Sequence, residues 1–94
     1  MKYVVLKSWS DYDCGAPCAA IVNDTVYESW QDAYDAIVKD LLDTYKVSSL
    51  EELGYDYELP NRNKEGDTTH KCGTAWINDD DGETLYDIQT IKVN

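Results

Sequence analysis

The chain has 94 residues, of which 43% are hydrophobic, and this length and composition indicate one folded domain over residues 1–94 rather than a disordered chain. Nineteen acidic against eight basic residues give a formal net charge of -11, which argues against direct binding to nucleic acid or anionic lipid. No apolar run reaches membrane-spanning length, and an odd number of cysteines, three, fits a reducing compartment, so we expect a cytoplasmic protein.

The first predicted element is a strand over residues 2–9 (KYVVLKSW), rich in β-branched and aromatic residues. Its centre, Tyr3 to Leu6, is apolar on both faces, which favours an interior position in a sheet. A loop with Gly15 and Pro17 follows, and residues 18–22 return as a second, antiparallel strand.

Residues 30–45 predict an amphipathic helix. Ser29 stands at the N-cap position, and Asp32 can reach back to the Ser29 amide in the manner of a capping box. The apolar residues recur at the spacing of one helical face and are Trp30, Ala33, Tyr34, Ile37, Val38, Leu41, Leu42 and Tyr45.

A short helix is expected over residues 48–54, with Ser48 and Glu51 as its capping box. Residues 55–70 are polar and contain a proline and a glycine, so they predict a loop that is mobile or functional.

The last part of the chain predicts a β-hairpin. Strands over residues 71–78 and 84–93 flank an Asp-Gly turn at 79–82. In the last strand Tyr86 and Ile88 fall on one face, whereas Ile91 and Val93 fall on the other. A bulge near Gln89 would place all four on the same face. The fold class is therefore α+β: a four-stranded antiparallel sheet in the order ββαββ, with one helix packed across it.

Nucleophilic catalysis finds little support. His70 is the single histidine, no serine stands in a Gly-x-Ser-x-Gly elbow, and no glycine-rich phosphate loop is present. We expect a protein that is not an enzyme.

The cysteines and the histidine offer a possible metal site. They form a Cys₃His set, a composition found in structural zinc sites, although their spacing is not that of a zinc knuckle. The competing interpretation is three reduced thiols, some buried as small hydrophobic side chains, with no cofactor. The four candidate ligands are Cys14, Cys18, His70 and Cys72.

Carboxylates recur along the polar face of the predicted helix and at the hairpin tip. Neighbours on such a helix face are about 5–6 Å apart, a spacing comparable to that of phosphates along one DNA strand. These side chains could occupy a basic channel built for nucleic acid, although Lys39 interrupts the row and could pair with Asp35. The candidate partner-binding residues are Asp32, Asp35, Asp40, Asp43, Asp79, Asp80, Asp81 and Glu83.

Two segments carry a resemblance. Residues 76–82 (WINDDDG) and 86–91 (YDIQTI) resemble the ends of many small acidic phage-encoded proteins. Residues 87–91 are also similar to the tail of a prophage Cas9 inhibitor of the anti-CRISPR type, which imitates DNA. The order of elements around them differs from that inhibitor, so no residue role is transferred. What the resemblance implies is a phage protein that counters a host defence.

The sequence therefore predicts a non-enzymatic inhibitor that binds a basic host protein, such as a nuclease, by presenting carboxylates in place of phosphates. The eight tyrosines and three tryptophans fit a protein-binding surface or, equally, a core built from tyrosine. The alternatives are an accessory or structural phage protein with incidental acidity and a small zinc-stabilised interaction module.

Overall fold

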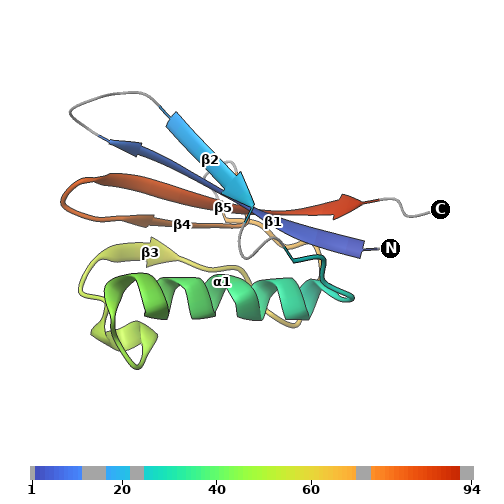
Figure 1. Ribbon diagram of the computed structural model, residues 1–94. Coiled ribbons are helices and arrows are strands. Elements are labelled where there is room, and N and C mark those ends of the chain that lie inside the picture. Colours follow the sequence, from blue (N-terminus) through green and yellow to red (C-terminus); the bar gives the residue numbers. More distant parts are fainter. Residues whose placement is uncertain (1, 12–16, 22–24, 70–72, 92–94) are drawn as a thin grey trace.

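The computed structural model describes residues 2–11, 17–21, 25–69 and 73–91, and they form one antiparallel sheet covered on one face by a helix (Figure 1). The strands lie in the order β2-β1-β5-β4-β3. The four predicted strands are neighbours in this sheet, so the predicted α+β fold is confirmed. The elements are β1 (Lys2–Asp11), β2 (Pro17–Ile21), helix α1 (Trp30–Tyr45), the 3-10 helix η2 (Leu50–Glu52), β3 (Asp56–Glu58), β4 (Ala75–Asn78) and β5 (Gly82–Ile91).

The additional strand β3 forms one edge of the sheet, inside the segment predicted as a loop. Its three residues are too few and too acidic to show an alternating apolar pattern; only Tyr57 packs against the core. The segment beyond β3 has its own hydrogen bonds, including one from the Asn61 amide to the Asp67 carboxylate (3.0 Å). The predicted loop is thus partly regular structure.

Helix α1 begins and ends where the sequence predicts. The Ser29 hydroxyl accepts a hydrogen bond from the Asp32 amide (3.1 Å), which is one half of the predicted capping box. At the other end Lys46 adopts the left-handed conformation (φ 56°) and its amide donates to the Leu42 carbonyl, which terminates the helix.

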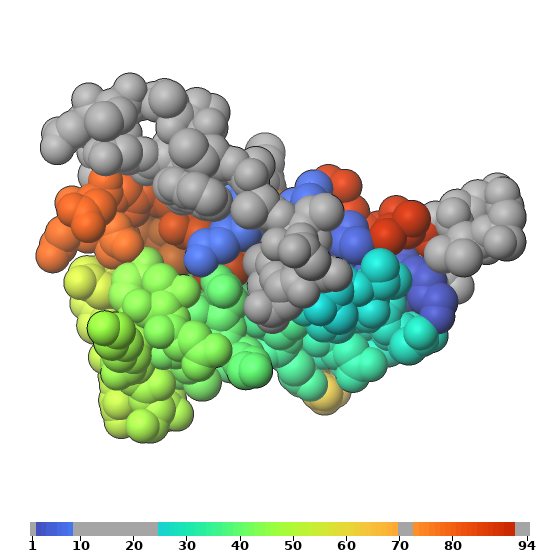
Figure 2. Space-filling model, in the orientation of Figure 1, coloured from blue at the N-terminus to red at the C-terminus, as the bar shows by residue number. Residues whose placement is uncertain are grey.

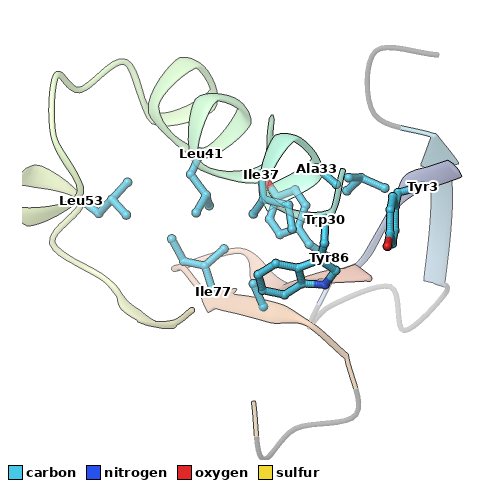
Figure 3. Packing of buried hydrophobic residues seen from close by; sticks show 10 residues of the cluster. Tyr3, Trp30, Ala33, Ile37, Leu41, Leu53, Ile77 and Tyr86 are labelled. Carbon is cyan, nitrogen blue, oxygen red and sulfur yellow. The ribbon is translucent and has the colours of Figure 1, made fainter. Parts of the chain in front are cut away.

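The core lies between α1 and the sheet (Figure 3). The helix buries a stripe made of Trp30, Ala33, Ala36, Ile37 and Leu41. Because Ala36 is buried while Val38 and Leu42 are only half-buried, the inward face is rotated from the predicted stripe toward the side that carries Asp40. The sheet contributes Tyr3 and Val5 from β1, Ala75 and Ile77 from β4 and Tyr86 from β5, and Leu53 closes one end.

The pairing of β1 with β5 runs without interruption from Lys2 opposite Ile91 to Asp11 opposite Gly82. The predicted bulge near Gln89 is therefore wrong. Apolar residues occur at both even and odd positions of β5 because they lie on both faces of the strand. Tyr86 and Ile88 face the helix, and Leu85 and Ile91 face away from it.

The short helix also differs from its prediction. It spans Leu50–Glu52, with Ser49 at its N-cap position, and the Ser48 amide donates to the Glu52 carboxylate (3.1 Å). The predicted capping box between Ser48 and Glu51 is wrong: Glu52 reaches the Ser48 amide, and the element is a single 3-10 turn rather than an α-helix.

Candidate protein-binding surface

Asp40 lies at the interface between α1 and the sheet. Its Oδ2 accepts hydrogen bonds from Lys7 Nζ (2.8 Å) and from the Tyr86 hydroxyl (2.6 Å). The Lys7 ammonium lies 5.6 Å from the centre of the Tyr86 ring, and the Asp40 side chain is 22% exposed. Burial, followed by the bond to Asp40, raises the pKa of Tyr86 far above its ordinary value. The prediction that Asp40 belongs to an exposed acidic row is wrong, because the inward face of α1 is rotated toward it.

Asp35 is exposed but paired. The Arg62 guanidinium, from the segment after β3, donates Nε and Nη2 to the two carboxylate oxygens (2.8 and 2.9 Å). This bidentate pair holds the pKa of the Asp35 carboxyl below its ordinary value. The sequence analysis named Lys39 as the possible partner of Asp35, whereas the structure places Arg62 there.

Asp79 closes the β4–β5 hairpin and joins it to the helix. Its carboxylate accepts from the amides of Asp81 and Gly82 (2.9 Å each) and from the Tyr45 hydroxyl at the end of α1 (2.7 Å). Partial burial raises the pKa of the Asp79 carboxyl, but these hydrogen bonds outweigh it and the pKa lies below its ordinary value. Asp79 is therefore a structural carboxylate at the base of the predicted acidic tip.

Tyrosine hydroxyls and carboxylates form a recurrent pair in this protein. Tyr3 donates to Glu65, Tyr45 to Asp79 and Tyr86 to Asp40. In the described part of the chain Tyr55 is the tyrosine that stays exposed, and the others pack in or against the core. The structure thus favours tyrosine as the core aromatic. The composition already carried a signal for these tyrosine–carboxylate pairs, because the chain has eight tyrosines, no phenylalanine and nineteen acidic residues.

The other predicted binding residues remain at the surface. Asp32 and Asp43 are exposed on α1, Asp80 and Asp81 are exposed at the hairpin tip, and Glu83 is half-buried.

The hairpin tip, the end of α1, η2 and the start of β3 lie at the same end of the molecule, a region we call the acidic end because each of these parts carries carboxylates (Figures 1 and 2). Tyr45 joins α1 to Asp79, and Asp56 is paired with Asn78 at the start of the hairpin turn. Lys46 is the basic residue that the described segments contribute here. Six of its carboxylates are exposed, and the half-buried Asp79 and Glu83 lie at its base: the acidic end consists of Asp43, Glu51, Glu52, Asp56, Asp80 and Asp81 together with Asp79 and Glu83.

The other end of α1 is charge-balanced. A shallow groove of about 450 Å³ is lined by residues 25–28 and by Asp32, Asp35, Ala36 and Lys39. Its acids have basic neighbours: Glu28 pairs with Lys2, and Asp35 pairs with Arg62. The groove is thus a weaker attractant for a basic partner than the acidic end.

One of the four predicted zinc ligands belongs to a described strand. Cys14, His70 and Cys72 lie outside the described residues, and Cys18 is described only as a position in β2. Among the side chains that are described, no three His, Cys, Asp or Glu residues are grouped to hold a metal ion. Within the same residues, no helix has the length and apolarity needed to cross a membrane.

Comparisons with protein-family models, with curated proteins and with solved structures found no match to this chain.

Proposed function

We propose that this protein is a non-enzymatic inhibitor that binds a basic surface of another protein, with carboxylates taking the place of nucleic-acid phosphates. The observation that carries this proposal is the acidic end, where the end of α1, η2, the start of β3 and the β4–β5 hairpin contribute eight carboxylates, six of them exposed, and where Lys46 is the basic residue among the described segments. Such a concentration of one sign of charge raises the association rate with a positively charged surface and disfavours nucleic acid.

The natural target class is a nuclease or another nucleic-acid-binding effector, because such proteins present basic channels. A phage protein that blocks a host defence nuclease, as anti-CRISPR proteins do, is the biological setting that we propose for it. The charge on the chain, formally -11 on 94 residues, supports this proposal.

A competition experiment tests the proposal. Labelled duplex DNA is bound to each member of a panel of nucleic-acid-binding proteins that includes an RNA-guided nuclease, and its release by the protein is followed by fluorescence anisotropy. We expect release from at least one member at low salt, and a steep loss of this effect as the salt concentration rises. Failure to displace DNA from any member, or displacement that ignores ionic strength, would contradict charge mimicry.

The acidity also has an internal use, which favours a second candidate: an accessory or structural phage protein whose acids serve its own fold. Asp40, Asp79 and Glu65 bind tyrosine hydroxyls of the same chain. The competition experiment separates the two candidates, because an accessory protein of this kind would leave all the DNA complexes intact.

The zinc-stabilised module remains a separate proposal. Metal analysis of the purified protein, together with the change in melting temperature after chelation, tests it directly.

A further inference from the structure

The sheet has a second face, opposite α1, which we call the outer face. In Figure 1 the helix covers the other side of the sheet. An antiparallel sheet with one face toward solvent normally carries polar side chains on that face. Here the alternation of side chains places five described apolar residues on it, none of which belongs to the core cluster: Val4, Leu6, Trp76, Leu85 and Ile91.

The strand register brings the apolar residues of the outer face together. Leu85 of β5 lies directly opposite Trp76 of β4, and Leu6 of β1 lies opposite Asp87, two residues further along β5. Side chains directly opposite in an antiparallel pair have Cβ atoms about 4.5–5.5 Å apart. All three apolar side chains are half-buried, so part of each reaches solvent.

Carboxylates lie beside these apolar residues and, at one position, among them. Glu58 of β3 is paired with Trp76, and the next row runs from Asp56 through Asn78 to Glu83. Asp87 lies among the apolar residues, directly opposite Leu6 and two residues along β5 from Leu85, and its carboxylate accepts hydrogen bonds from Thr74 Oγ1 (3.4 Å) and Gln89 Nε2 (3.0 Å). Among the described residues Lys2 is the basic residue of this face, and it forms an ion pair with Glu28 at the margin of the sheet. Asp56 and Glu83 also belong to the acidic end, so the two surfaces are continuous.

We propose that the outer face is the docking surface for a basic protein, which buries Leu6, Trp76 and Leu85 and places its arginines against the carboxylates of the same face. The inference rests on the proposed function, and it adds the surface that would make binding specific for one basic protein. An apolar centre with a charged rim is the usual anatomy of a protein interface. Arginine suits this face because its guanidinium pairs with carboxylates and also stacks on aromatic rings.

Charge distinguishes this occupant from a second copy of the chain. Two copies joined through the outer face would bring together four carboxylates from each, namely Asp56, Glu58, Glu83 and Asp87. Like charges in a buried interface are strongly unfavourable, whereas a basic partner neutralises them.

Two peptides of equal charge test the proposal: acetyl-Arg-Gly-Leu-Gly-Arg-amide and acetyl-Arg-Gly-Gly-Gly-Arg-amide. Binding is measured by calorimetry, and the contacted amides of the ¹⁵N-labelled protein are mapped by NMR. If the outer face is the docking surface, the leucine peptide binds about three- to tenfold more tightly, because its side chain gains apolar contact. The amide shifts should then centre on residues 4–6, 76 and 85.

Matched variants locate the effect. Val4→Thr and Leu85→Thr should reduce the advantage of the leucine peptide, while Val26→Thr should not. Val26 is 51% exposed and lies outside the sheet, so it controls for the same chemical change elsewhere on the surface. The NMR map on the unaltered protein gives an answer even if Leu85→Thr fails to fold.

Four outcomes are distinguishable. A leucine advantage that depends on Val4 and Leu85 supports the inference. Equal binding of the two peptides, lost at high salt, overturns the docking surface and leaves the proposed function standing. Binding of neither peptide at low salt overturns both. Dimerisation in sedimentation experiments that is abolished by Leu85→Thr would show that a second copy covers the face, which also overturns the inference.

Discussion

Asp40 and Asp80 are the same residue type in opposite settings. Asp40 lies between the helix and the sheet, where Lys7 and Tyr86 satisfy one of its oxygens. Asp80 lies at the hairpin tip, exposed, one residue beyond the carboxylate that closes the turn. The difference teaches that the acidic excess of this chain has two roles: some carboxylates hold the fold together, and the others form a surface.

Removal of the interface carboxylate gives the largest expected loss of stability. Asp40→Ala leaves the Lys7 ammonium and the Tyr86 hydroxyl without their shared acceptor, and both groups are partly buried. We expect the free energy of unfolding to fall by about 2–3 kcal/mol, measured by urea denaturation. Asp43→Ala, on the exposed side of the same helix, should change it by less than about 0.5 kcal/mol. Similar losses in the two variants would abolish the distinction between the two roles.

The hairpin carboxylate should show an intermediate loss with a defined pH dependence. Asp79→Asn removes the charge that accepts from Tyr45, and we expect a loss of about 1–2 kcal/mol at pH 7. Because the folded-state pKa of Asp79 is lowered, its contribution is present above its ordinary pKa of 3.8 and is lost as the pH falls below that value. Unfolding curves of variant and wild type should therefore converge in acid.

Asp80→Asn is the control for this prediction, since it removes one charge from the neighbouring exposed residue. A constant gap between Asp79→Asn and wild type down to the lowest pH would contradict the assigned role of Asp79.

Tyr86→Phe tests the structural role of Asp40 from the sheet side of the interface between α1 and the sheet. The ring is kept and the donor to Asp40 is lost, while Lys7 still pairs with Asp40. A loss of about 1 kcal/mol in the free energy of unfolding is expected, by the same urea method. Tyr55→Phe, at the exposed tyrosine, should be neutral. If both variants were neutral, the tyrosine–carboxylate pair would not stabilise the fold.

The smallest expected change in stability belongs to the hairpin tip. The double variant Asp80→Asn/Asp81→Asn should unfold within about 0.5 kcal/mol of wild type, because both side chains are exposed. A clear loss of stability in thermal melts would mean that these carboxylates are structural as well.

The sequence specifies much of this fold. The apolar period of residues 30–45 and the Ser29 cap fix the bounds of α1, and the Asp-Gly turn fixes the β4–β5 hairpin. It could not reveal β3, whose three residues carry no alternating pattern and which exists because it pairs with β4.

The roles of the carboxylates were beyond sequence reasoning for a different reason. A rotation of the helix by part of a turn decides whether Asp40 faces solvent or the sheet, and that rotation is set by packing of Ala36 and Ile37. The partner of Asp35 comes from Arg62, 27 residues away, and such a distance in sequence leaves no local pattern.

The central claim is that the surplus negative charge forms a surface at one end of the molecule. The affinity of the protein for the peptide acetyl-Arg-Gly-Gly-Gly-Arg-amide tests it most directly. Asp80→Asn/Asp81→Asn and Glu28→Gln/Asp32→Asn each remove two charges, the first pair from the acidic end and the second from the charge-balanced groove. We predict that calorimetry at low salt will show at least about a threefold greater loss of affinity for the first variant. Equal losses would mean that net charge alone attracts the peptide, which would contradict the claim.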